Sequence, residues 1–181
     1  MQPRIQEVLD HLDASRIALK AAVSNVSANN VAVRPAPERW SVTEIVDHLA
    51  LVETRVARLL VGELQKAQTS GLPSESESSS VVQEQLVSGL LDRSKPIVAG
   101  ETSQPRGISL DAAFATLDSE RNALRDAIIA ADGLALGTVR LPHPRFGDLD
   151  LYQWFTFLGA HEARHVEQVR ETAAALEAGL R

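Results

Sequence analysis

Apolar residues recur at intervals of three and four along most of the chain, which is the spacing of helices that bury one face. Four long segments show this pattern. It predicts helices over about residues 3–25, 41–65, 110–131 and 150–178. No segment shows the alternation of β-branched and polar residues that is typical of a strand. We therefore predict no strand and an all-α fold.

Local signals mark where three of these helices begin. Ser41 and Glu44 have the spacing of a capping box, in which each side chain accepts a hydrogen bond from the other residue's backbone N–H. Ser109 can cap the third long helix. Asp150, with Gln153 three residues later, can cap the last one.

The connection between the second and third long helices is long. Residues 69–80 are rich in serine and glutamate and are expected to form a mobile surface loop. A short helix is expected at about 82–92, followed by a Pro/Gly-rich connection over 95–107. The length of 181 residues fits one domain. Together these features predict a single domain over 1–181, a four-helix bundle with a long crossover.

Composition excludes several classes of protein. The net charge is −6 and the basic residues are scattered, which argues against nucleic-acid binding. No apolar run reaches the roughly 18 residues of a membrane span. There is no cysteine, so any metal must be held by histidine and carboxylate. The same absence, and a start without an apolar leader, lead us to expect a cytoplasmic protein.

The apolar stripe of the last helix is interrupted by polar side chains. His161 and His165 are four residues apart on that stripe, so one metal ion can reach both rings, and Gln168 follows on the same side. His48 lies on the stripe of the second helix and would complete a three-histidine site with an open position, as in catalytic zinc sites. Imidazole also suits nickel, iron and copper. On spacing alone, hydrogen-bonded core histidines without metal are an equal alternative.

His161–His165 spells HEARH, which matches the HExxH signature of zinc proteases. The longer form of that signature fails, because Gln168 and Glu171 occupy the positions of its glycine and third histidine. No strand is predicted to bind a peptide, and no later helix can return a ligand. We therefore predict that the chain is not a protease. Glu162 is expected on the flank of the helix, near the metal without necessarily acting as a general base.

Three other polar residues have weaker claims. Arg121 lies on the stripe of the third long helix and could pair with a substrate carboxylate, although a packed stem with its head in water is the better expectation. His143 is expected as an exposed turn residue. His11 is expected at the surface.

Three segments together resemble the DinB/YfiT-like superfamily: RWSVTEIVDHLALVE (39–53), HPRFGDLDLYQW (143–154) and HEARHVEQ (161–168). The resemblance covers essentially the whole chain. It implies a four-helix bundle, often a homodimer, with a divalent metal, zinc or nickel, held by His48, His161 and His165. It also implies that Gln168 lies beside the site.

Members of that superfamily with assigned activity include S-transferases that use bacillithiol, mycothiol or glutathione, and many others are described as metal-dependent hydrolases. The resemblance therefore implies a small-molecule substrate and either reaction, with a low-molecular-weight thiol as co-substrate of a transferase. The alternative is a non-catalytic bundle that binds a small molecule or acts under stress, with weak metal binding or none.

Overall fold

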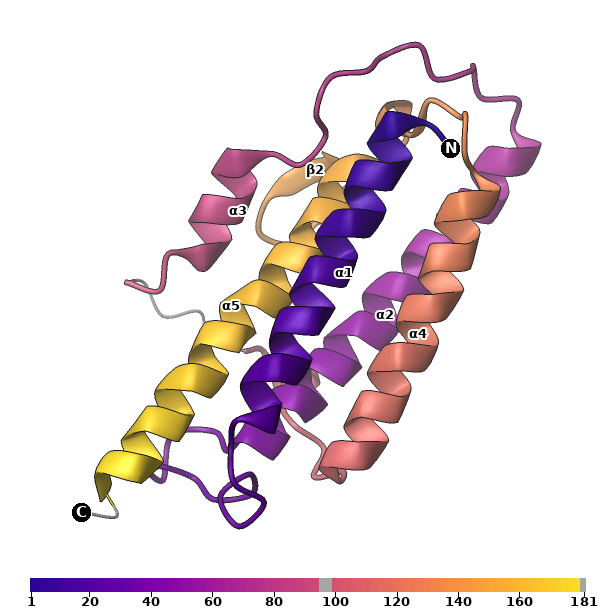
Figure 1. Cartoon of the computed structure of the whole chain (residues 1–181). Coiled ribbons are helices and arrows are strands. Elements are labelled where there is room, and N and C mark those ends of the chain that lie inside the picture. Colours follow the sequence, from indigo (N-terminus) through magenta and orange to yellow (C-terminus); the bar gives the residue numbers. More distant parts are fainter. Residues whose placement is uncertain (95–98, 180–181) are drawn as a thin grey trace.

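The protein is described here by a computed structural model that covers residues 1–94 and 99–179. Four long helices lie side by side (Figure 1), namely α1 (Pro3–Ser24), α2 (Val42–Thr69), α4 (Leu110–Ala130) and α5 (Leu151–Gly179). All four lie where the apolar spacing predicts them, and α2 continues past its predicted end. The all-α bundle is thus confirmed. Part of the Pro/Gly-rich connection, residues 95–98, lies outside the described residues.

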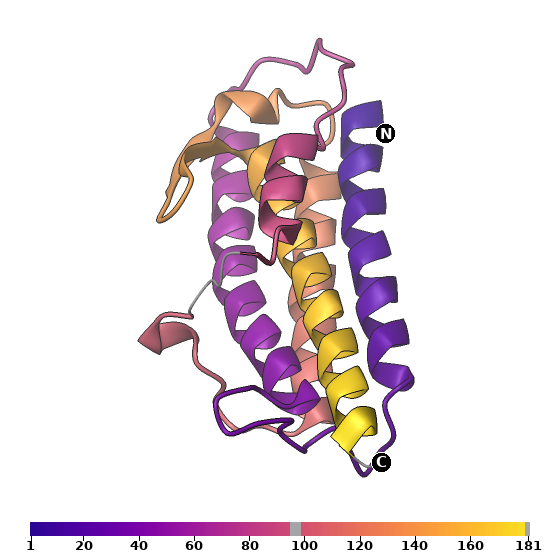
Figure 2. The same ribbon diagram turned by 90° about the vertical axis from the view of Figure 1, so that its left-hand side faces the viewer.

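The helices do not simply alternate in direction. α1 and α5 run one way, while α2 and α4 run the other way (Figure 1). The chain therefore has to return along the bundle between α2 and α4, and it does so on the outside (Figure 2). This crossover carries α3 (Glu84–Leu91), which packs on α5, and a short 3-10 helix, η1 (Glu101–Ser103), beside α2. The long crossover and its short helix are both confirmed.

Helix starts follow the predicted caps. The Glu44 backbone N–H donates to Ser41 Oγ at 3.2 Å, and the Ser41 backbone N–H donates to the Glu44 carboxylate at 2.8 Å. Asp150 and Gln153 make the same reciprocal pair of bonds, each 2.9 Å long, at the start of α5. These caps fix where α2 and α5 begin, and so fix which of their residues face the core.

The apolar core falls into two clusters along the bundle axis. One includes Leu12, Leu60, Leu124 and Phe155 and lies toward the start of α1, and the other includes Leu19, Ile45, Leu117 and Val169. Each cluster receives residues from all four long helices. Buried charged residues lie between them: Arg16, Glu53, Arg121 and Glu162.

The prediction of no strand was wrong. β1 (Arg140–His143) and β2 (Gly147–Asp150) form an antiparallel hairpin that leads directly into α5. Both strands are short and lack β-branched residues, so they carry no sequence signal of strand. Gly147 adopts φ 71°, a left-handed conformation that suits glycine after the turn.

The serine-rich segment 69–80 is largely exposed, as predicted, but Glu75 is an exception. Its carboxylate accepts hydrogen bonds from Arg4 at 2.8 Å and from the Tyr152 hydroxyl at 2.9 Å. These bonds fasten the segment to the starts of α1 and α5. Over the described ranges, no helix combines the length and apolar character needed to cross a membrane.

Candidate metal centre

Three histidines converge between α2 and α5. His161 and His165 lie one turn apart on α5, with ring centroids 4.7 Å apart. His48 on the antiparallel α2 faces both, at 5.5 Å from His161 and 4.8 Å from His165. One nitrogen from each ring lies within 4.8 Å of the others, and within the described ranges this is the only such group of potential ligands. The three residues expected from the sequence are therefore brought together.

Two of the rings are oriented by a hydrogen bond from their second nitrogen. His48 Nδ1 lies 2.6 Å from the carbonyl oxygen of Ser103, and His165 Nδ1 lies 2.7 Å from Oε1 of Gln168. Because both partners are acceptors, each Nδ1 carries the proton and each Nε2 keeps its lone pair. Metal-ligating histidines show this arrangement almost always. The donor set therefore fits a divalent metal ion.

The three imidazoles are held in the neutral form. Burial, with a smaller contribution from the nearby His48 ring, lowers the pKa of His161 to about 3. Burial also lowers the pKa of His165 well below 6.5 and lowers that of His48. His48 and His165 are only 5% and 8% exposed, whereas His161 is more open to solvent. Neutral rings with free lone pairs are the form that binds a metal.

Aromatic side chains pack against the histidines. Trp40 lies 5.0 Å from His48, and Phe157 stacks on His161 at 5.6 Å. The ring of His143 also contacts Phe157, with centroids 4.5 Å apart. The expectation of an exposed turn residue at position 143 was wrong, because the hairpin folds that ring onto Phe157 and Trp154.

Asp47, next to His48, was not identified from the sequence as a residue that supports the site. Its side chain is fully buried and accepts hydrogen bonds from the backbone N–H groups of Arg106 at 2.5 Å and Gly107 at 2.8 Å. These bonds fasten the end of the crossover to α2, close to the Ser103 carbonyl that orients His48. No sequence signal identifies Ser103, because it acts through its backbone.

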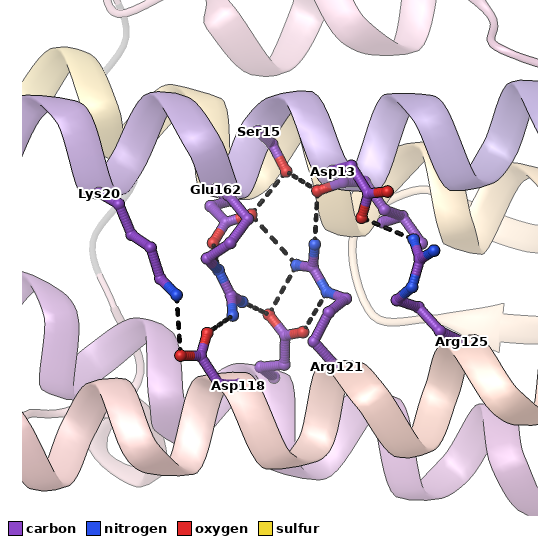
Figure 3. Close-up of polar contacts among 10 residues, drawn as sticks. Asp13, Ser15, Lys20, Asp118, Arg121, Arg125 and Glu162 are labelled. Carbon is purple, nitrogen blue, oxygen red and sulfur yellow. Dashed lines mark hydrogen bonds and ion pairs between the residues drawn. The ribbon is translucent and has the colours of Figure 1, made fainter.

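Glu162 and Arg121 do not lie where the sequence placed them. Glu162 is 1% exposed and points into the bundle, where it accepts hydrogen bonds from Ser15 at 2.5 Å and from Arg16 at 2.6 Å (Figure 3). Arg121 is 3% exposed, so a head in water was the wrong expectation. The charges of Glu53 and Glu162 hold its pKa above the ordinary value, although burial alone would lower it. Neither residue is free to serve the metal or a substrate.

His11 was expected at the surface, which was wrong. Its ring is half-buried between α1 and α5, and its Nε2 lies 3.1 Å from the backbone oxygen of Thr156. Burial lowers its pKa. A residue at the edge of the α1 stripe becomes buried because α5 passes close to it.

Comparison with known proteins agrees with this architecture. The sequence model of the DinB superfamily matches residues 11–169. YuaE, an uncharacterized protein of Bacillus subtilis (strain 168), is 30% identical over 146 residues, which is 80% of this chain and 83% of that protein. The crystal structure of TT2238, a four-helix bundle protein, superposes with a TM-score of 0.58 at 23% identity, covering 92% of this chain and 98% of that one. The family match spans His48, His161 and His165, and the chain belongs to the DinB superfamily.

Proposed function

We propose that the protein is a divalent-metal-dependent enzyme that acts on a small molecule, as a thiol S-transferase or a hydrolase, with zinc or nickel held by His48, His161 and His165. One observation carries the proposal: three neutral imidazoles converge, and acceptors orient two of them for ligation. A core that only needed to satisfy buried histidines would not have to bring one nitrogen from each of three rings within 4.8 Å of the others.

The residues around the site would act either as metal ligands or as groups that orient those ligands. His48, His161 and His165 would hold the ion, while Ser103 and Gln168 keep two of the rings turned toward it. A bound ion would supply Lewis acidity at the coordination position that three ligands leave open. Trp40 packs against His48, and Phe157 packs against His161.

The charge of the ligand set supports an anionic co-substrate. Three neutral histidines do not compensate the double positive charge of the ion. The nearest acids are already engaged, Asp47 by the backbone of Arg106 and Gly107, and Glu162 by Arg16 and Arg121. A thiolate from a low-molecular-weight thiol meets this demand, because it is anionic and the nucleophilic form of the thiol.

The first test is metal content. Untagged protein is purified and compared by ICP-MS with His48→Ala and with His143→Ala, which removes a histidine outside the trio. We expect about one zinc or nickel per chain in the wild type and in His143→Ala, and loss of the metal in His48→Ala.

The absence of metal from the wild type, even after incubation with excess zinc and nickel, would overturn the proposal in favour of a non-catalytic, small-molecule-binding bundle. If metal is present, transfer assays with bacillithiol, mycothiol and glutathione, beside ester and amide hydrolysis assays, separate the two reactions. The expected homodimer and cytoplasmic location stay predictions.

A further inference from the structure

Four buried charges, one from each long helix, form a closed ring at the centre of the bundle. They are Arg16 of α1, Glu53 of α2, Arg121 of α4 and Glu162 of α5. Figure 3 shows Arg121 and Glu162 pointing toward each other. Arg16 contacts Glu53 at 3.2 Å and Glu162 at 2.6 Å. Arg121 contacts the same two carboxylates at 2.5 Å and 3.1 Å. Each carboxylate is thus shared by both guanidinium groups.

The ring is balanced in charge and fully hydrogen-bonded. Its two positive and two negative side chains are each 7% exposed or less. Arg16 also pairs with Asp118, a partly exposed acid of α4 outside the ring, at 2.9 Å. Ser15 adds a bond to Glu162, and the carbonyl of Leu12 accepts one from Arg121 at 2.7 Å. No buried polar side-chain atom in the described part of the chain lacks a partner. The bonds are directional, so they define a single alignment of the four helices.

The ring is adjacent to the candidate metal centre along both helices. Glu162 follows His161 in the sequence, so its side chain leaves α5 about 100° around the helix from that of His161, and Glu53 lies about one and a half turns after His48 on α2. The two helices that carry the histidines therefore also carry the two carboxylates. Both carboxylates are clamped by the same pair of arginines, so α2 and α5 are linked through Arg16 and Arg121 at the level of the site.

Apolar packing alone constrains the axial alignment of two helices less than this ring of charged residues does. The clusters above and below the ring are built largely from aliphatic side chains, which tolerate small shifts along the axis. A slip of one residue moves a helix by about 1.5 Å, which would separate His48 from the α5 pair by more than a metal bond tolerates. Fixing such a register is the best-attested role of a polar contact within a core.

We propose that the ring of Arg16, Glu53, Arg121 and Glu162 is a positioning device for the metal centre, which fixes the axial register of α2 against α5 and so preorganises His48 against His161 and His165. This inference rests on the proposed metal binding. None of the four residues belongs to the proposed ligand set of His48, His161 and His165. They act through the helices that carry its ligands.

The test separates positioning from stability. All four charges are replaced by apolar residues of similar size in one variant, Arg16→Met, Glu53→Leu, Arg121→Met and Glu162→Leu. A matched control, Asp13→Asn with Arg125→Met, removes an ion pair of 2.6 Å that joins α1 to α4 outside the ring. Both variants keep the net charge. Zinc affinity is measured by competition with a chelator, and the ligand geometry by the absorption spectrum of the Co²⁺-loaded protein.

We expect the ring variant to bind zinc at least about 10-fold more weakly than the wild type and to show an altered Co²⁺ spectrum, while the control matches the wild type. Because apolar replacement of a buried ion network is often neutral or stabilising, weaker binding in a folded variant is not a loss of stability. If the quadruple variant does not fold, Glu53→Gln, which keeps the shape of the side chain, is judged by the same two measurements.

Unchanged affinity and an unchanged spectrum in the folded ring variant, or in Glu53→Gln where that variant decides, would overturn this inference and leave the proposed metal site intact. A wild type that binds neither zinc nor Co²⁺ would instead remove the proposed function, and this inference with it. The two failures are therefore distinguishable from the wild-type titration alone.

Discussion

Gly159 on α5 lets α1 approach closely beside the ring of His11. A Cβ atom at this position would lie 2.5 Å from Cδ2 of His11, well inside van der Waals contact. The His11 ring cannot turn aside without giving up its contact with the backbone oxygen of Thr156. We expect Gly159→Ala to lower the free energy of unfolding by about 1–3 kcal/mol, as overpacking of a core does. Urea titration followed by circular dichroism measures it.

Gly62 on α2 provides the matched control for that substitution. It is also a helical glycine, but a Cβ there meets nothing within 4 Å. Gly62→Ala should raise the free energy of unfolding by about 0.5–1 kcal/mol, because alanine loses less backbone entropy on folding. Equal effects of the two substitutions would show that α1 does not pack on Gly159 as described.

Gln168 orients His165 without itself facing the metal. Its side-chain oxygen accepts the hydrogen bond from His165 Nδ1 at 2.7 Å. Gln168→Ala frees the ring to rotate, so zinc affinity should fall about 10- to 100-fold with little change in stability. Chelator competition measures the affinity. Glu167→Ala, which removes only an exposed side chain beside it, should leave affinity unchanged, and a similar loss there would contradict the assignment.

At the scale of elements, Asp47 joins α2 to the end of the crossover. Its carboxylate binds the backbone N–H groups of Arg106 and Gly107 and the guanidinium of Arg106. Asp47→Asn removes the charge and one acceptor, so we expect faster hydrogen exchange over residues 101–108 while α4 stays protected. Mass spectrometry of deuterated peptides reports this. Asp111→Asn, at an exposed position in the first turn of α4, is the control and should change nothing over 101–108.

The same scale shows how far the sequence predicts the structure. Helices and their caps depend on residues three or four apart, so the stripes and the Ser41–Glu44 pair sufficed to place them. The histidine pair at 161 and 165 is local in the same way. The hairpin at 140–150 could not be predicted, because its short strands lack β-branched residues and one contains Pro142.

Contacts between helices could not be predicted from the sequence, for a different reason. The stripe of each helix shows which face is buried, but not which level of one helix meets which level of another. Arg121 was therefore visible as a stripe residue, while its pairing with Glu53 and Glu162 was not. His48 was joined to the α5 pair from its place beside the apolar stripe of the second helix and from the resemblance to the DinB/YfiT-like superfamily.

At the scale of the whole molecule, the three histidines of the candidate site make the metal-free fold sensitive to acid. In the unfolded chain His161 takes up a proton near pH 6.5, whereas in the fold it does so only near pH 3. Between these values the unfolded state binds more protons, so this contribution to stability is fully present above pH 6.5 and is lost as the pH falls toward 3. His48 and His165 act in the same direction.

We therefore expect metal-free protein, kept in EDTA, to unfold at a lower urea concentration at about pH 5 than at about pH 7.5. His161→Gln removes one of the three groups and should show a smaller difference between the two pH values. Identical pH dependence in wild type and His161→Gln would contradict the burial of that ring in its neutral form.

The parallel pairing of α1 with α5 has a consequence for biosynthesis. α1 is made first and packs chiefly on α5, which emerges from the ribosome only after the whole crossover, α4 and the hairpin. At typical rates of translation, α1 waits on the order of ten seconds for its partner with its apolar face exposed. The exposed apolar face of α1 in the nascent chain is therefore a binding site for chaperones. A truncated chain that ends before α5 would lack the helix on which α1 packs, and its bundle would stay incomplete.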